Sequence, residues 1–154
     1  LKEVQKINRR QLERFVERIR KALWVLGEKK IAVWGLTFKP NTDDLRSSVA
    51  IDLVERLVAE GAEVIAYDPK GMERAADLPI GSKIRLATSP GEAAAGAEAL
   101  VIATEWPEFS RVDFRKIRES MVSPLLFDGR NLLDPATMRR YGFEYHGIGR
   151  GLEG

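Results

Sequence analysis

Apolar side chains recur every three or four positions over the first 26 residues of the chain, and mostly polar or charged residues fill the positions between them. The apolar positions are Leu1, Val4, Ile7, Leu12, Phe15, Val16, Ile19, Leu23 and Leu26. This spacing predicts an α-helix of about seven turns with one apolar stripe, and Gly27 is typical of the residue that ends a helix. We expect the stripe to pack either on the domain that follows or on a second copy of the chain.

After residue 27, apolar runs alternate with amphipathic stretches and turn residues, which predicts strands alternating with helices. The predicted strands cover residues 30–36, 62–67, 83–87, 99–104, 125–128 and 143–147. The predicted helices cover 48–60, 72–76, a segment that begins at the capping sequence 89–92, 113–121 and 134–140. This order indicates an α/β fold, namely a Rossmann-like, doubly wound, mainly parallel six-stranded sheet with a long N-terminal helix. We therefore divide the chain into a helix, residues 1–27, and a Rossmann-like domain, residues 28–154.

The composition indicates a globular protein and excludes several kinds of chemistry. Hydrophobic residues make up 44% and charged residues 31% of the 154 positions, and no apolar run is long enough to span a membrane. The absence of cysteine excludes disulfides, thiolate metal ligands and a cysteine nucleophile in this chain. We expect a cytoplasmic protein and assign no metal-binding residue.

Positive charge is concentrated in the first 30 residues, which hold ten Lys or Arg against four Asp or Glu, whereas the whole chain has a net charge of only +2. A basic helix can bind nucleic acid. Glu3, Glu13 and Glu17 interrupt this one, however, and no row of aromatic residues accompanies it. A solvated helix face or a subunit contact is the favoured interpretation, with neither a nucleic acid nor a membrane as partner.

The first predicted strand does not lead into the glycine-rich turn of a dinucleotide-binding domain. The spacing G-x-G-x-x-G is absent after Gly35. A polar loop fills its place and carries Lys39, Asn41, Asp43, Asp44 and Arg46. Because open α/β sheets bind ligands at the carboxyl ends of their strands, we expect this loop to hold a nucleotide or phosphate in a different way.

Two more polar clusters follow predicted strands: residues 104–106 (TEW) and 128–131 (DGRN). In a doubly wound sheet, the loops after Gly35 and Thr104 face one crevice, and the loop after Asp128 lies close by. Each charged residue could instead form an ordinary surface ion pair. Three polar clusters at one edge of the sheet nevertheless favour a binding site.

The residue types in these clusters suit a nucleotide. Lys39, Arg46 and Arg130 keep their positive charge at every relevant pH, and an arginine adds a planar fork of donors for phosphate oxygens. Phe38 or Trp106 could offer an apolar wall to a base.

Other polar and aromatic residues are predicted to be structural. Asp43 and Asp44 would hold their loop by accepting backbone N–H groups rather than act as an acid–base pair. Asp68 follows the second strand, where dinucleotide-binding folds place the acid that binds ribose. Without the glycines, a turn formed by Asp68-Pro69 is the better interpretation. Trp24, Trp34 and His146 are predicted to pack in the structure.

Four segments, in order and in spacing, then identify a family. They are residues 35–48 (GLTFKPNTDDLRSS), 67–70 (YDPK), 104–106 (TEW) and 127–131 (FDGRN). Together they resemble the carboxyl-terminal domain of the UDP-glucose/GDP-mannose dehydrogenase family, and most of all its UDP-glucose 6-dehydrogenase branch. Residues 1–27 resemble the long central helix that precedes that domain, so the resemblance covers essentially the whole chain.

The resemblance implies that this domain binds the UDP part of a UDP-sugar and that the central helix forms the core of a homodimer. It implies that Phe38, Lys39 and Arg130 contact the substrate and that Arg46 reaches toward NAD, which the partner domain binds. Ser47 departs from the family, because many members carry an acidic residue or asparagine there.

The family's reaction is a two-step, NAD-dependent oxidation of the sugar C6 alcohol to a carboxylate through a covalent thiohemiacetal on cysteine. The resemblance implies that this cysteine, the catalytic Lys and Asn, and the glycine fingerprint for NAD all precede Leu1. We therefore assign no catalytic residue to this chain and expect it to bind substrate without turning it over.

Two other hypotheses remain open on the sequence alone. The chain could be a stand-alone nucleotide-binding or interaction module with a degenerate Rossmann fold, using its first helix to dimerise. It could also be an independent NAD-binding domain, although the missing glycines disfavour this hypothesis.

Overall fold

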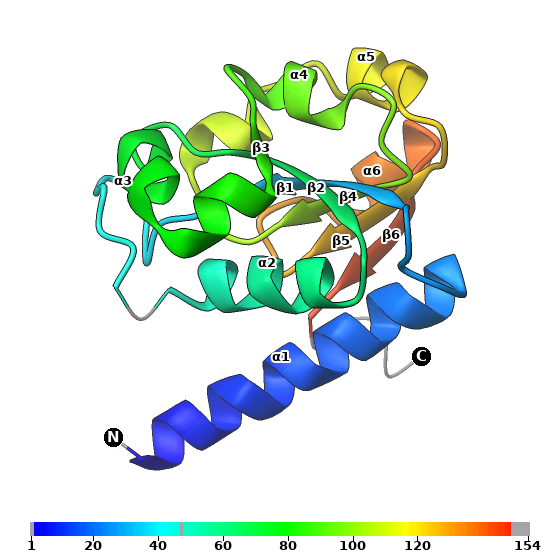
Figure 1. Cartoon of the computed structure of the whole chain (residues 1–154). Helices are drawn as coiled ribbons and strands as arrows, with labels where there is room; N and C mark the ends of the chain where they lie inside the picture. The colour runs from blue at the N-terminus through cyan, green and yellow to red at the C-terminus, as the bar shows by residue number, and fades with distance from the viewer. Residues whose placement is uncertain (1, 47, 149–154) are drawn as a thin grey trace.

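The computed structural model of the chain describes residues 2–46 and 48–148; Leu1 and Ser47 lie outside the described residues, as do the side chains of residues 2–8, which include Val4 and Ile7 of the predicted stripe. Six strands form one parallel sheet in the order β3-β2-β1-β4-β5-β6 (Figure 1). The strands are β1 (Lys30–Trp34), β2 (Glu63–Tyr67), β3 (Arg85–Leu86), β4 (Ala99–Ile102), β5 (Leu125–Asp128) and β6 (Glu144–Gly147). The chain crosses from one half of the sheet to the other between β3 and β4, which confirms the predicted doubly wound fold.

Helices cover both faces of this sheet. They are α1 (Lys2–Leu23), α2 (Val49–Ala59), α3 (Met72–Asp77), α4 (Pro90–Ala94), α5 (Phe114–Ser120) and α6 (Pro135–Arg140). Helices α1 and α2 lie on one face, and α4, α5 and α6 lie on the other (Figure 1). Each face has its own apolar core, because side chains of a buried parallel strand alternate between the two layers. None of the described helices is long and apolar enough to cross a membrane.

The carboxyl ends of the central strands are level with one another. Trp34, the last residue of β1, pairs with Tyr67 of β2 and Ile102 of β4, and Ile102 in turn pairs with Asp128 of β5. The loops that follow β1, β2, β4 and β5 therefore leave the sheet side by side. This register brings the predicted polar clusters to one edge.

Helix α1 ends earlier than the sequence predicted. Its last residue is Leu23, and Trp24 takes the left-handed conformation that Gly27 was expected to supply (φ 69°). The prediction that Trp24 packs is wrong, because 89% of the residue is exposed. Trp34 is fully buried, as predicted, and the ring of His146 stacks on Phe127 with their centroids 4.8 Å apart.

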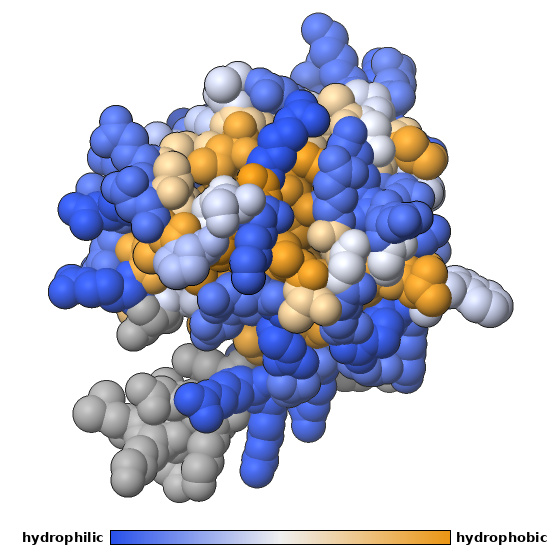
Figure 2. All heavy atoms as spheres, viewed as in Figure 1, coloured by the Kyte–Doolittle hydropathy of each residue, from blue (hydrophilic) through white to orange (hydrophobic). Residues whose placement is uncertain are grey.

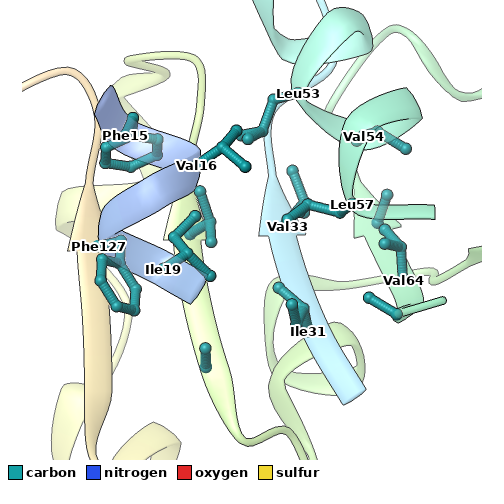
Figure 3. Packing of buried hydrophobic residues seen from close by; sticks show 14 of the residues in the cluster. Phe15, Val16, Ile19, Ile31, Val33, Leu53, Val54, Leu57, Val64 and Phe127 are labelled. Atoms are coloured by element: carbon teal, nitrogen blue, oxygen red, sulfur yellow. The ribbon is translucent and has the colours of Figure 1, made fainter. Parts of the chain in front are cut away.

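The apolar stripe of α1 packs on the sheet and on α2. Figure 3 shows Phe15, Val16 and Ile19 of α1 beside Phe127 of β5 and facing Leu53 of α2. The outward surface of α1 is hydrophilic (Figure 2). The described part of this helix is thus a structural layer of the domain.

Ion pairs between α1 and α2 flank this apolar contact. Arg56 Nη2 donates to Glu13 Oε2 at 2.8 Å, and Arg20 Nε donates to Glu60 Oε1 at 2.8 Å. Arg20 also pairs with Glu17 on its own helix. The hydrogen bond from Arg20 lowers the pKa of Glu60, and the bond from Arg56 lowers the pKa of Glu13. These partly exposed pairs fix how α1 lies on α2 more than they stabilise the fold.

Shortening Ile19 to alanine tests how firmly α1 belongs to the domain. Ile19 is fully buried, so Ile19→Ala is expected to lower the free energy of unfolding by about 2–5 kcal/mol. Lys21→Ala on the exposed side of the same helix is the control, with an expected change within about 0.5 kcal/mol. Urea denaturation followed by circular dichroism measures both. Equal, small losses in the two variants would show that α1 does not contribute to the cooperative core.

The third strand is shorter than the sequence predicted, whereas the cap of α4 is as predicted. The third strand is confined to Arg85–Leu86, because a 3₁₀ turn, Pro79–Lys83, takes up the preceding residues. At the start of α4, Ser89 caps the helix by accepting from the Glu92 N–H, as predicted. The Glu92 carboxylate accepts from the N–H of Thr88, the residue before this cap.

Candidate functional site

A cavity of about 370 Å³ opens at the carboxyl edge of the sheet. Its walls come from α1, from the loop after β1, from the first turns of α2, from the end of β4, and from the segments that follow β4, β5 and β6. The lining residues are Gln11, Leu12, Phe15, Thr37, Phe38, Lys39, Val49, Ala50, Leu53, Ile102, Ala103, Gly129, Arg130 and Ile148. This size and this mixture of an apolar wall with a few polar groups are typical of a small-molecule site.

The carboxylate of Asp68 holds two loops beside the cavity in place. It is fully buried at the end of β2. Its Oδ2 accepts from the backbone N–H groups of Leu36 and Thr37 at 2.8 and 3.0 Å, and also from the Thr37 hydroxyl. Its Oδ1 accepts from the N–H groups of Lys70 and Gly71, at 2.9 and 2.8 Å. The carboxylate therefore forms the predicted turn and also clamps the loop after β1.

The loop after β4 is tied to the same point. The Thr104 hydroxyl donates to the Thr37 carbonyl at 2.9 Å, and Trp106 Nε1 donates to Thr37 Oγ1 at 3.0 Å and to Asp68 Oδ2 at 3.1 Å. Trp106 is almost completely buried and does not line the cavity. It joins two loops and does not offer an apolar wall to a base, which corrects that part of the prediction.

Gly35 lets these two loops approach closely. Its φ is +102°, and a Cβ atom placed on it would lie 2.5 Å from both the Cβ and the backbone N of Thr104. This close approach requires glycine for a packing reason. It does not require the phosphate-binding role that the first glycine of a dinucleotide fingerprint has.

Of the two carboxylates in the polar loop between β1 and α2, one bonds within the loop and the other joins it to α3. Asp44 accepts from the backbone N–H of Arg46 at 2.9 Å and from its guanidinium, and these bonds lower the pKa of Asp44. This confirms the predicted role of Asp44. Asp43 instead pairs with Arg74 of α3 at 2.8 Å, and that hydrogen bond lowers its pKa.

The first turn of α2 begins beside the same loop. Ser48 caps the helix by accepting from the N–H of Ile51 while its hydroxyl donates to the carbonyl of Leu36 at 2.8 Å. Val49 and Ala50 line the cavity. The positive end of the α2 dipole therefore faces the cavity from the side of the loop after β1.

A second buried carboxylate, Asp128, arranges the loop after β5. Its Oδ1 accepts from the N–H groups of Arg130 and Leu132, and its Oδ2 accepts from the N–H of Leu133 at 2.8 Å and the hydroxyl of Tyr145. The Arg130 side chain reaches back over the loop after β4. There its Nη2 donates to Glu105 Oε2 at 2.9 Å.

The structure brings three of the four predicted site residues together. Phe38, Lys39 and Arg130 line the cavity. Phe38 is 51% exposed, so much of its ring is accessible beside the cavity. Arg46 does not line the cavity; 90% of its side chain is exposed, and its described partner is Asp44.

Sequence reasoning missed the contribution of α1. Gln11, Leu12 and Phe15 form one wall of the cavity. The helical stripe contained Leu12 and Phe15 but could not show which part of the sheet they would cover. Gln11 gave no signal at all, because a polar residue beside an apolar stripe is ordinary on a helix.

The described residues do not fit the pyrophosphate and ribose of NAD. The glycine fingerprint is absent after β1. The acid at the end of β2, Asp68, is fully buried and has both oxygens engaged by N–H and O–H donors, so it cannot accept from a ribose hydroxyl. Nor do the described residues contain a group of three His, Cys, Asp or Glu side chains that could hold a metal ion.

These features define a class: a doubly wound α/β domain whose cavity lies at the switch point of the sheet but whose dinucleotide cradle is missing. The profile of the "UDP-glucose/GDP-mannose dehydrogenase family, UDP binding domain" matches residues 32–135. The chain belongs to the UDP-glucose/GDP-mannose dehydrogenase family, and its described fold is that of the UDP-binding domain. The resemblance drawn from the four sequence segments is confirmed.

Individual relatives agree with this assignment. The chain is 52% identical over 121 residues to a UDP-glucose 6-dehydrogenase of Rhizobium meliloti, a match that covers 79% of this chain and 27% of that protein. It is 47% identical over 126 residues to a UDP-glucose 6-dehydrogenase of Pseudomonas aeruginosa, covering 79% of this chain and 28% of the relative. The chain thus spans well under half the length of these relatives.

Solved structures of the family have the same fold. A UDP-glucose dehydrogenase from Pyrobaculum islandicum superposes with a TM-score of 0.79 at 28% identity, covering 96% of this chain and 31% of that one. A UDP-D-ManNAc dehydrogenase from Pyrococcus horikoshii superposes with a TM-score of 0.72 at 34% identity, covering 96% of this chain and 32% of that one.

Proposed function

We propose that the cavity binds the UDP part of a UDP-sugar and that the chain is the UDP-binding portion of an NAD-dependent UDP-sugar 6-dehydrogenase, with UDP-glucose as the favoured substrate. The complete enzyme would oxidise the C6 alcohol to a carboxylate. The observation that carries this proposal is that Lys39 and Arg130, from loops after two different strands, line one cavity together with the exposed ring of Phe38.

The chemistry of the lining residues suits a nucleoside diphosphate. Lys39 and Arg130 supply permanent positive charge for the diphosphate, and the start of α2 adds the positive end of its dipole. The ring of Phe38 supplies a flat apolar surface on which a base can stack. Glu105 occupies one N–H of the Arg130 guanidinium, which leaves its remaining donors for phosphate oxygens.

The remainder of the enzyme would hold NAD, which accepts hydride in this reaction. Arg46, exposed at the mouth of the loop after β1, is the residue of this chain that we propose reaches toward NAD. We further propose a cytoplasmic homodimer assembled through the N-terminal helix. The chain by itself would bind UDP and UDP-sugars without oxidising them, because it has no cysteine to form the covalent intermediate.

Titration calorimetry of the chain with UDP, UDP-glucose, GDP-mannose and NAD tests the proposal. UDP and UDP-glucose are expected to bind, and Lys39→Ala and Arg130→Ala are each expected to weaken UDP binding by about tenfold or more, since each removes a charge-assisted contact. Lys70→Ala is the matched control, because Lys70 is exposed and does not line the cavity. Its expected change is less than twofold.

Two results would contradict the proposal. A preference for NAD with no binding of UDP would favour an independent NAD-binding domain. Nucleotide binding that is absent, or unaffected by both substitutions, would favour a stand-alone interaction module.

A further inference from the structure

Helix α1 reaches past the sheet and forms one side of the cavity. The rings of Phe15 and Phe127 meet edge-on with their centroids 6.2 Å apart, which places Phe15 over the end of β5. Gln11 lies one helical turn before Phe15. Gln11 and Leu12 of α1 line the cavity, and so do residues in the first turn of α2.

Four side chains give the cavity its polar lining: Gln11, Thr37, Lys39 and Arg130. Lys39 and Arg130 carry only donors and positive charge, which suits phosphate and not the edge of a base. The Thr37 hydroxyl is already engaged, since it donates to Asp68 and accepts from Trp106. Among these lining side chains, only Gln11 offers both a donor and an acceptor that no described residue occupies.

A carboxamide matches the polar edge of a pyrimidine. Uracil presents a carbonyl acceptor next to an N–H donor, and a glutamine side chain can pair with both at once. The Gln11 residue is exposed, so its side chain can turn to meet a ligand without breaking an existing bond.

We propose that Gln11 is the residue of this chain that recognises the base of the bound nucleotide. This inference rests on the proposed function and adds to it the division of the cavity into two parts. Lys39 and Arg130 hold the diphosphate, while Gln11 bonds the edge of the uracil and Phe38 covers its face. The N-terminal helix is then part of the substrate site itself.

The test compares UDP with inorganic pyrophosphate, which has the charge of the diphosphate but no base. Gln11→Ala is expected to raise the Kd for UDP by about tenfold and to leave the Kd for pyrophosphate unchanged, because it removes hydrogen bonds to the base alone. Lys39→Ala is expected to weaken both ligands. Lys21→Ala, on the same helix but about 15 Å away along its axis, is the control and should change neither.

A second variant tests whether the chain's preference between uracil and cytosine changes, rather than whether binding is lost. Glutamate accepts hydrogen bonds but cannot donate them, and the carboxylate pairs with the exocyclic amine of cytosine and not with the carbonyl of uracil. Gln11→Glu is therefore expected to shift the ratio of Kd for UDP to Kd for CDP by about tenfold in favour of CDP. The new charge also repels the diphosphate. Because UDP and CDP have the same diphosphate, this repulsion cancels in the ratio of their Kd values.

The outcomes separate this inference from the proposed function. If the unmodified chain binds UDP but Gln11→Ala weakens UDP and pyrophosphate equally, or weakens neither, then Gln11 does not recognise the base and only this inference is overturned. If the unmodified chain binds no nucleotide, the proposed function is overturned and this inference falls with it. Thermal unfolding of each Gln11 variant should match that of the unmodified chain, since the residue is exposed.

Discussion

Asp68→Ala is expected to lower the free energy of unfolding by about 3–5 kcal/mol, because several buried donors lose their acceptor and each unsatisfied donor costs about 1–3 kcal/mol before relaxation. The carboxylate is fully buried and accepts from the N–H groups of Leu36 and Thr37 on one oxygen and of Lys70 and Gly71 on the other. Alanine would leave these buried donors without a partner, and each unsatisfied donor has its own cost. Urea denaturation at pH 7 measures the loss.

The substitution should also reduce nucleotide binding, because Asp68 fixes the loop that carries Phe38 and Lys39. Asp113→Ala is the matched control: Asp113 caps α5 by accepting from two N–H groups at an exposed site away from the cavity. Loss of this cap is expected to cost about 1 kcal/mol and to leave UDP binding unchanged. A similar small cost for both variants would mean that water replaces the lost acceptor at Asp68.

Gly35→Ala is the second substitution with a large expected effect, a destabilisation of about 3 kcal/mol or more with loss of UDP binding. Two costs combine here. The backbone has φ +102°, which strains any residue with a Cβ, and that Cβ would lie 2.5 Å from the backbone N of Thr104. The loops after β1 and β4 would have to separate, and with them the hydrogen bond from Thr104 to Thr37.

Gly96→Ala isolates the first of these costs. Gly96 also has a positive φ, +74°, but a Cβ there would meet only Lys30 Nζ, at 3.5 Å. Its expected cost is about 1 kcal/mol, from backbone strain alone. Differential scanning calorimetry of the two variants gives the cost of the clash as their difference. Equal transition temperatures would show that the two loops yield easily.

All six strands of the sheet could be predicted from the sequence, because most of them are short apolar runs between turn signals, although β1, β3 and β4 are shorter than predicted. Residues 125–128 are a strand in both the prediction and the structure, for example. The end of α1 could not be placed, since the pattern favours glycine as a helix stop and Gly27 was the nearest one. In the structure Trp24 adopts the left-handed conformation instead, which no residue preference predicts for a tryptophan.

The site was predictable where one strand end leads directly into a polar loop, as with Lys39 and Arg130. It was not predictable where a residue acts across the sheet. Asp68 reads as a local turn, and the turn exists, but its second oxygen holds the backbone of a loop more than thirty residues earlier in the chain. Gln11 likewise enters the cavity only because α1 lies over β5.

The buried state of Asp68 also limits what a change in the turn after β1 could achieve by itself. In dinucleotide-binding proteins, the acid at the end of the second strand faces the ribose. Here the acid at that position holds the loop after β1, so placing glycines after Gly35 would supply a pyrophosphate turn but no ribose acceptor. Freeing the carboxylate would cost the fold several of its buried hydrogen bonds at once. Dinucleotide binding would therefore need changes in three loops, and not only in the turn after β1.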